Sequence, residues 1–198
     1  EMVYKYSIQA TDKAGNVTKK DITFTVDVTN PEVKVTGIID GFFNKDMKPE
    51  YEITDTNLDN KNTQVTLNDK AYKSGTKVSA QDYYNLKLHG ADLASNTTVR
   101  NIVFAIDKDK PVIKFLEEMS GKYFMPNFVI EDLTDYTIIA MTLDGEEYEL
   151  GEPVTKEGKH VLYIEVKDKA ENVESISIEF VLDNTPPKFI VNGIKNNS

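Results

Sequence analysis

The stretch Thr11-Asp-Lys-Ala-Gly-Asn-Val17 reads TDKAGNV, and two close variants of it occur further along the chain. One is ADLASNT, which begins at Ala91, and the other is KDKAENV, which begins at Lys167. The asparagines of the three copies lie 80 and then 76 residues apart, at Asn16, Asn96 and Asn172. Self-similarity at a nearly fixed spacing indicates a repeated structural unit, so this stretch decides how the chain is divided.

Three further residue types keep the same spacing. A phenylalanine follows each asparagine by eight residues, an aspartate follows it by eleven, and a proline stands four residues beyond the aspartate. The phenylalanines are Phe24, Phe104 and Phe180, the aspartates Asp27, Asp107 and Asp183, and the prolines Pro31, Pro111 and Pro187. Division at these junctions predicts two whole units, 30–109 and 110–186. Residues 1–29 are then the closing hairpin of a preceding unit, and 187–198 the first strand of a following one.

The composition excludes several classes of function. The 198 residues include 33 acidic and 23 basic side chains, a net charge of −10, with no cysteine and no tryptophan. Such a charge repels phosphate backbones and anionic lipid, so we expect neither nucleic-acid binding nor binding to a membrane surface. No run of 18 apolar residues occurs, so we expect no membrane insertion of this fragment either. Without cysteine there is no disulfide framework and no thiolate metal site. The sequence shows no membrane span and no signal-peptide pattern.

Alternation of polar and apolar residues predicts strands. In residues 4–10 the even positions are apolar, which is the period of a half-buried strand, and the same period flanks each repeated turn. Each TDKAGNV-like segment is therefore predicted to join two amphipathic strands in a hairpin. About seven short strands per unit predict an all-β fold of tandem antiparallel β-sandwiches. Helices are expected only as single turns near 56–60, 80–83 and 133–136.

The turns have their own chemistry. The aspartate at the start can accept backbone N–H groups, and the asparagine at the end tolerates a positive φ. The residue directly before the asparagine is Gly15, Ser95 or Glu171. This variation predicts that any left-handed backbone falls on the asparagine. Two other segments, 66–72 and 142–148, read as strand, two-residue turn and strand.

The order of motifs resembles the bacterial immunoglobulin-like repeats of Gram-positive surface and secreted proteins. The motifs are ITDTNLD from Ile53, VTLN from Val65, YKSGT from Tyr72, YNLKL from Tyr84, DLASN from Asp92 and FAID from Phe104. The resemblance covers nearly the whole chain, and it implies an immunoglobulin-like module rather than one particular function. The tyrosine that usually precedes the last hairpin is replaced in the third copy by His160. Because of this replacement, the sequence does not decide whether the third copy forms the hydrogen bond of a tyrosine corner.

No catalytic or cofactor-binding residue is assigned from the sequence. The two histidines, His89 and His160, are the only bases that could activate a hydroxyl nucleophile. His89 falls on the polar side of its strand, and His160 takes the place of a packing tyrosine, so we interpret the first as solvent-facing and the second as structural. The carboxylates are interpreted as surface charges, because a small sandwich offers no cleft for a pair of them. The chain is therefore not expected to be an enzyme.

Calcium is an open alternative, although no metal site is assigned. Asp12 with Asn16, or the junction aspartates, could supply some of the oxygen ligands that Ca²⁺ requires. Those aspartates are Asp27, Asp107, Asp109 and Asp183. Related adhesin repeats stiffen their linkers in this way, which the resemblance only suggests. The competing interpretation is turn capping and solvation of strand ends, because each turn has too few acidic ligands.

Adjacent aromatic residues raise the alternative of sugar binding. The pairs are Phe42-Phe43, Tyr83-Tyr84 and Tyr123-Phe124. If they lie in strands, each pair places one ring on each face of a sheet. The outer ring could then contact a glycan.

The function expected from these features is that of a spacer or stalk in a larger extracellular bacterial protein, either secreted or on the cell surface. Proline in each junction predicts short, stiff joints between units. The expected partners are neighbouring domains of the same chain. The alternatives are an adhesin module that binds a host protein or glycan, and an accessory module of a polysaccharide-degrading enzyme. The partial units at 1–29 and 187–198 are expected to be ordered by an adjacent unit or by head-to-tail pairing with another copy.

Overall fold

The computed structural model describes residues 2–116, 119–120 and 123–190, which are strands, turns and loops without a helix. The predicted all-β class is confirmed. No helix in this part of the chain is long and apolar enough to cross a membrane. The chain divides into two compact units, Glu1–Asp107 and Lys108–Ser198.

The predicted one-turn helices are wrong. Residues 56–60, 80–83 and 133–136 form turns, bends and the first residues of strands. At two of these places an aspartate accepts a backbone N–H two residues on, from Asn57 to Asp55 at 2.8 Å and from Thr134 to Asp132 at 2.9 Å. Such side-chain bonds satisfy the backbone locally and compete with a helical turn.

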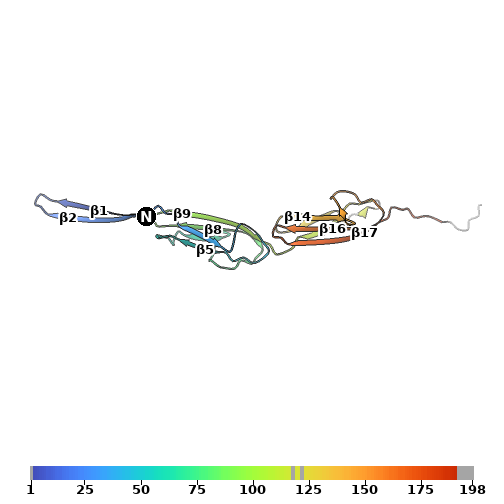
Figure 1. Ribbon diagram of the computed structural model, residues 1–198, viewed down its shortest axis with the longest axis horizontal. Coiled ribbons are helices and arrows are strands. Elements are labelled where there is room, and N and C mark those ends of the chain that lie inside the picture. The colour runs from blue at the N-terminus through green and yellow to red at the C-terminus, as the bar shows by residue number, and fades with distance from the viewer. Residues whose placement is uncertain (1, 117–118, 121–122, 191–198) are drawn as a thin grey trace, which may run out of the picture. The chain divides into compact units, whose positions relative to one another are not determined.

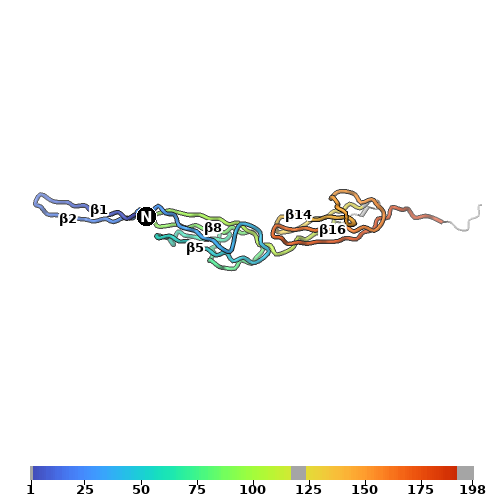
Figure 2. The backbone as a smooth tube through the Cα atoms, viewed as in Figure 1, coloured from blue at the N-terminus to red at the C-terminus, as the bar shows by residue number. Residues whose placement is uncertain are grey.

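The first unit begins with a hairpin of two strands, β1 (Met2–Thr11) and β2 (Val17–Val26) (Figure 1). The strands are antiparallel, with Tyr4 opposite Phe24, and their backbones run side by side in Figure 2. The predicted strands and turn are confirmed, but the predicted half-burial is wrong for this hairpin. All residues of both strands are exposed, because neither strand contributes to the core of the unit.

The rest of the first unit consists of two sheets. Their order is β4-β9-β8-β6-β7 in one sheet and β3-β5 in the other. All neighbours are antiparallel except β4 and β9, which run parallel. The bounds are β3 (Glu32–Thr36), β4 (Gly41–Phe43), β5 (Glu50–Thr54), β6 (Gln64–Leu67), β7 (Lys70–Ala71), β8 (Asp82–Ala91) and β9 (Thr97–Ile106).

The core of the first unit lies between these sheets. Leu86, Leu88 and Phe104 from β8 and β9 are at most 1% exposed, and Val33 and Ile53 from the other sheet pack against them. The apolar positions of this hairpin therefore face inward, as the alternation predicts.

The second unit repeats this arrangement in part, since no strand in the described part of the chain pairs with β17 as β4 pairs with β9, and β11 and β12 form a pair of their own. Its sheets have the orders β15-β14-β16-β17, β10-β13 and β11-β12. The core contains Leu162, Ile164 and Phe180, and Ile113 and Ile130 pack against it. The bounds are β10 (Val112–Phe115), β11 (Met119–Ser120), β12 (Tyr123–Phe124), β13 (Phe128–Glu131), β14 (Tyr136–Leu143), β15 (Glu146–Glu147), β16 (Gly158–Asp168) and β17 (Val173–Leu182).

The two predicted two-residue turns are confirmed. Asn68 and Asp69 join β6 to β7 with φ of 48° and 62°, and Asp144 and Gly145 join β14 to β15 with φ of 53° and 87°. Two successive positive φ values define the turn type that matches the twist of antiparallel strands.

Candidate functional site

The three repeated turns share one hydrogen-bond network. In each, the aspartate accepts the backbone N–H of the asparagine at one carboxylate oxygen and its side-chain Nδ2–H at the other. For Asp92 and Asn96 both distances are 2.7 Å. The same bonds, at 2.7 to 2.9 Å, join Asp12 to Asn16 and Asp168 to Asn172. The repeat therefore conserves the two residues that close the hairpin.

The prediction of positive φ on the asparagine is wrong. The left-handed residue is the one before it, with φ of 90° at Gly15, 73° at Ser95 and 71° at Glu171. The backbone N–H of the asparagine must reach the carboxylate of the aspartate four residues earlier. The left-handed residue therefore lies one position before the asparagine. Only Gly15 occupies this conformation without strain, since a Cβ makes it costly by about 1–2 kcal/mol.

We expect Ser95→Gly and Glu171→Gly each to stabilise its unit by about 0.5–1 kcal/mol, because the relieved strain exceeds the extra backbone entropy of glycine. The measurement is the urea midpoint of the full chain. Ser95→Gly is the cleaner test, because Glu171 also pairs with Lys167 at 2.9 Å. Ser95→Ala, which keeps a Cβ, is the matched control. A lower midpoint for Ser95→Gly than for Ser95→Ala would contradict the assignment of strain.

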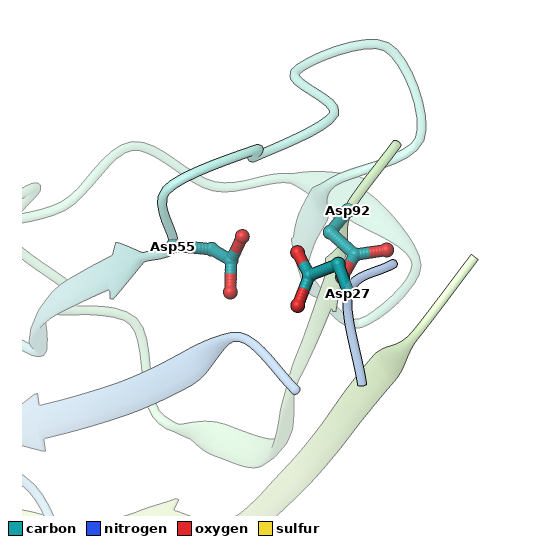
Figure 3. A group of neighbouring side chains, drawn as sticks. All are labelled: Asp27, Asp55 and Asp92. Atoms are coloured by element: carbon teal, nitrogen blue, oxygen red, sulfur yellow. The ribbon is translucent and has the colours of Figure 1, made fainter. Parts of the chain in front are cut away.

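Three aspartates gather where three strands of the first unit end (Figure 3). Asp27 directly follows β2, Asp55 follows β5 and Asp92 follows β8. One carboxylate oxygen from each lies within 4.8 Å of the other two. Asp92 is buried, and the other two are half-buried. This aspartate cluster connects the base of the exposed hairpin to the sheets.

Hydrogen-bond donors offset the repulsion among these charges. Asp27 accepts the Thr29 hydroxyl at 2.5 Å, the Asn57 Nδ2–H at 3.0 Å and the Thr29 backbone N–H at 3.0 Å. These bonds, that from the Thr29 hydroxyl first, lower the pKa of Asp27 to about 2. A lowered pKa means that the stabilisation is present above the ordinary value of 3.8 and is lost as the pH falls towards about 2. Asp27 is therefore ionised at neutral pH.

The oxygen ligands of the cluster are of the kind that Ca²⁺ prefers. With one oxygen from each, the three carboxylates fall short of the six to eight oxygens typical of calcium, so carbonyls or water would have to complete the shell. Calcium binding stays an untested alternative, as the sequence left it. The hydrogen bonds already join Asp27 to Asn57 and Asp92 to Asn96, so the cluster is at least a structural network.

Only one of the sequence-predicted calcium ligands, Asp27, belongs to this cluster. Asp12 is bonded to Asn16 within its own turn. Asp107 is buried, and its backbone N–H donates to the Phe43 carbonyl at 2.9 Å. Asp109 is exposed, and Asp183 accepts the Thr185 backbone N–H at 3.0 Å.

Sequence reasoning missed Asp55 and Asp92 as partners of Asp27. The available signal for Asp92 was its place in the repeated turn. Asp55 was visible only as a member of the motif ITDTNLD that begins at Ile53. Their meeting depends on which strand ends share one edge of the unit, and alternation alone does not specify that.

The histidines are both engaged by neighbouring polar groups. His89 is half-buried, and its Nδ1 lies 3.0 Å from the Asn62 carbonyl. His160 is buried, which agrees with its interpretation as structural. Its Nε2 lies 2.7 Å from the carbonyl of Lys156, four residues earlier. In the first unit Tyr84 donates in the same way to Ala80, at 2.8 Å. His160 thus contacts the carbonyl four residues earlier, as the tyrosine does in the first unit.

The second ring nitrogen of His160 determines its charge. Nδ1 lies 2.8 Å from a carboxylate oxygen of Asp144, and an ionised carboxylate only accepts. Nε2 faces a carbonyl, which also only accepts, so both contacts are hydrogen bonds only while the ring carries two protons and is cationic. The bond to Asp144 raises the pKa of His160 above 6.5. The pKa of Asp144 is lowered, chiefly by the backbone N–H of Val161 and then by His160.

The stability of the second unit should depend on pH through His160. A raised folded-state pKa gives stabilisation that is complete below pH 6.5 and is lost as the pH rises through the folded-state value. We expect a loss of about 1 kcal/mol, the size of one hydrogen bond. The measurement is urea unfolding at a series of pH values from about 5.5 to 8.5, a range set by the ordinary histidine pKa.

His160→Tyr is the control for this dependence, because it restores the residue type of Tyr84. We expect it to flatten the pH profile of the second unit and to leave that of the first unchanged. An unaltered profile in His160→Tyr would show that another group is responsible.

Two of the three aromatic pairs divide between the two faces of the sheet, as predicted. Phe43 and Tyr84 pack on Phe104, with centroid distances of 6.5 and 5.0 Å. Phe42 and Tyr83 lie on the exposed side, edge to face at 6.4 Å. In the third pair Phe124 is buried, while the side chain of Tyr123 lies outside the described residues.

A scan against protein-family models found no match, and a search of the curated proteins found no similar protein.

Proposed function

We propose that this chain is a non-catalytic, extracellular spacer or stalk built from immunoglobulin-like units, and that it belongs to a larger bacterial cell-surface or secreted protein. The observation that carries the proposal is the joint between hairpin β1–β2 and the sheets of the first unit. A spacer must keep its two ends apart, so its joints must resist bending. The contacts of residues 27–31 bear directly on this requirement.

The joint is held by side chains from three elements. Asn57 donates to the Asp27 carboxylate at 3.0 Å, and Asn96 donates to the Asp27 backbone carbonyl at 3.2 Å. At the other end of the joint, the Thr98 hydroxyl donates to the Pro31 carbonyl at 2.6 Å. Pro31 is also among the fully buried residues of the unit.

These contacts favour a stiff connection over a flexible one. Proline fixes φ at the end of the joint, and the bonds at both of its ends restrict the residues between. The same junction pattern recurs in the sequence at Asp107 with Pro111 and at Asp183 with Pro187. A repeated stiff joint is what a passive spacer needs, and it is of no evident use to an enzyme.

Small-angle X-ray scattering tests the proposal. A spacer requires that successive units do not fold onto each other. We expect the maximum dimension of the full chain to exceed that of a single unit by roughly 30 Å, about the length of its strands. The matched control carries about ten Gly and Ser residues inserted after Asp109, which should broaden the distance distribution. A full chain no longer than one unit would contradict the proposal.

One observation favours the adhesin alternative. Phe42 and Tyr83 form an exposed aromatic pair on β4 and β8, and Val103 on β9 is also exposed. Aromatic rings are common anchors in binding surfaces. Screening the chain against a glycan array and a panel of host matrix proteins tests this role. Binding that is abolished by Phe42→Ser and by Tyr83→Ser would support the adhesin role. The absence of hits would leave the spacer role as the proposed function.

A further inference from the structure

Strand β14 in the second unit has a long edge that is only partly covered by another strand. On one side it pairs with β16 from end to end, and the two strands lie beside each other in Figure 1. On the other side β15 pairs only with Thr142 and Leu143. The next contact is the hydrogen bond from the Tyr148 backbone N–H to the Met141 carbonyl, at 3.0 Å. Among the described residues, the outer edge of residues 136–140 therefore has no strand beside it.

The first unit closes the equivalent edge with a turn. Residues 60–63, which lie 76 positions before residues 136–139, do not continue β6. The Asp59 carbonyl accepts the Thr63 backbone N–H at 2.9 Å, and the Thr63 hydroxyl donates to the Ala91 carbonyl of β8 at 3.2 Å. Strand β6 therefore has only four residues, whereas β14 has eight. The open edge is a feature of the second unit alone among the two.

A groove runs beside this edge. Its volume is about 540 Å³, which lies within the usual range for ligand sites, and its walls are residues 138–142 and 147–150. Ile139 and Leu150 contribute apolar surface and are 47% and 53% exposed. Glu147 and Glu149 contribute two exposed carboxylates. The groove thus combines apolar and acidic side chains.

These groups define the chemistry of an occupant. The uncovered edge of a strand presents backbone N–H and C=O groups in a row, and a chain segment in extended conformation satisfies them. The carboxylates of Glu147 and Glu149 favour lysine or arginine in that segment, because complementary charges attract and orient a partner. The exposed Ile139 and Leu150 favour apolar side chains beside them.

A second copy of this chain fits the edge less well than a basic segment does. Two copies would bring the carboxylates of Glu147 and Glu149 together, and each chain carries a net charge of −10. In addition, the pairing of β14 with β16 shifts between Ile138 and Ala140, which marks a β-bulge. A bulge interrupts the regular edge that two long strands would have to share, but it leaves room for a short segment.

We propose that the outer edge of β14 is a docking site for an extended segment of a partner protein that is rich in basic and apolar side chains. The segment adds to the sheet beyond Tyr148, where β15 no longer covers β14. Its basic side chains lie near Glu147 and Glu149, and its apolar side chains contact Ile139 and Leu150. This role is additional to that of a spacer and does not depend on it.

Titration of the full chain with a synthetic peptide, followed by NMR, tests the proposal. The probe is a peptide of alternating lysine and valine with blocked ends, eight residues long like β14. We expect binding at peptide concentrations below about 1 mM, with shift changes in the amides of residues 136–141 and 147–150. The same peptide with glutamate in place of lysine should not bind. No binding of the lysine peptide, or shift changes confined to other parts of the chain, would overturn the proposal.

A pair of substitutions separates docking in the groove from general attraction to an acidic protein. Glu147→Lys should weaken binding by about threefold or more, because it replaces an attraction by a repulsion. Glu146→Lys makes the same change of charge on the neighbouring residue, whose side chain lies on the other face of the strand, and should leave the affinity nearly unchanged. Equal losses in the two variants would mean that the groove does not hold the peptide.

Methylated peptides test the backbone bonds themselves. In an extended chain the N–H groups of alternate residues point to the same side, so N-methylation of only the lysines or only the valines removes the donors from one side. We expect one of these two peptides to bind about tenfold more weakly than the other, since two or more hydrogen bonds to β14 are lost. Equal affinities of the two peptides would rule out pairing with the edge of β14.

Discussion

Replacing Phe104 with alanine is expected to destabilise the first unit by about 3–5 kcal/mol, the usual cost of deleting a buried phenylalanine. Its side chain is 1% exposed, and it stacks on Tyr84 and packs on Phe43. A domain of this size has a stability of only several kcal/mol, so the substitution brings the unit close to unfolding. The measurement is urea unfolding of the full chain, followed by NMR signals of each unit.

The repeat supplies matched controls for this substitution. Phe24 occupies the equivalent position in the hairpin but is 47% exposed, so Phe24→Ala should cost less than about 1 kcal/mol. Phe180→Ala should affect the second unit as Phe104→Ala affects the first, because Phe180 is only 4% exposed. Equal costs for Phe24→Ala and Phe104→Ala would mean that the hairpin is covered in the free chain.

Replacing Asp92 with alanine is expected to cost the first unit about 2–4 kcal/mol. Asp92 is 3% exposed, and its carboxylate accepts the backbone N–H and the side-chain Nδ2–H of Asn96. The substitution leaves two donors without their acceptor, at about 1–3 kcal/mol for each buried group. Loss of one charge from the aspartate cluster partly offsets this cost. Thermal or urea unfolding of the variant measures it.

Asp12→Ala is the matched control, since Asp12 makes the same bonds at an exposed turn where water can replace them. We expect it to leave the stability of the first unit nearly unchanged. If Asp92→Ala proved as mild as Asp12→Ala, the buried turn would not be a structural element of the unit.

The hairpins and the inward face of each unit were predictable from the sequence because they depend on local patterns. Alternation with period two identifies a strand and its apolar face, and the repeated turn fixes the register. Leu86 and Leu162 are buried for this reason. The Asp144-Gly145 turn was predictable on equally local grounds, from the preference of both residues for positive φ.

The backbone of the repeated turn was not predictable from residue preferences. Asparagine adopts positive φ more readily than serine or glutamate, yet Ser95 and Glu171 adopt it here. The two bonds from the aspartate to the asparagine outweigh the preference of the residue before it. A single Gly15 among the three copies was the only sequence signal of this conformation.

The aspartate cluster and the exposed hairpin could not be predicted because both depend on long-range arrangement. Asp27, Asp55 and Asp92 meet only once three strand ends lie together. The sequence of β1 and β2 predicts a core face, but it does not say whether a second layer lies over Tyr6 and Ile22. The role of His160 was predictable only in part, because its pairing with Asp144 depends on the packing of a distant turn.

Residue-resolved urea unfolding of the full chain by NMR tests whether each unit is sealed by its own core. We predict that amides of residues 32–106 disappear together in one transition and those of residues 112–182 in another, with Phe104→Ala shifting only the first and Phe180→Ala only the second. A single transition that either substitution shifts as a whole would contradict the account.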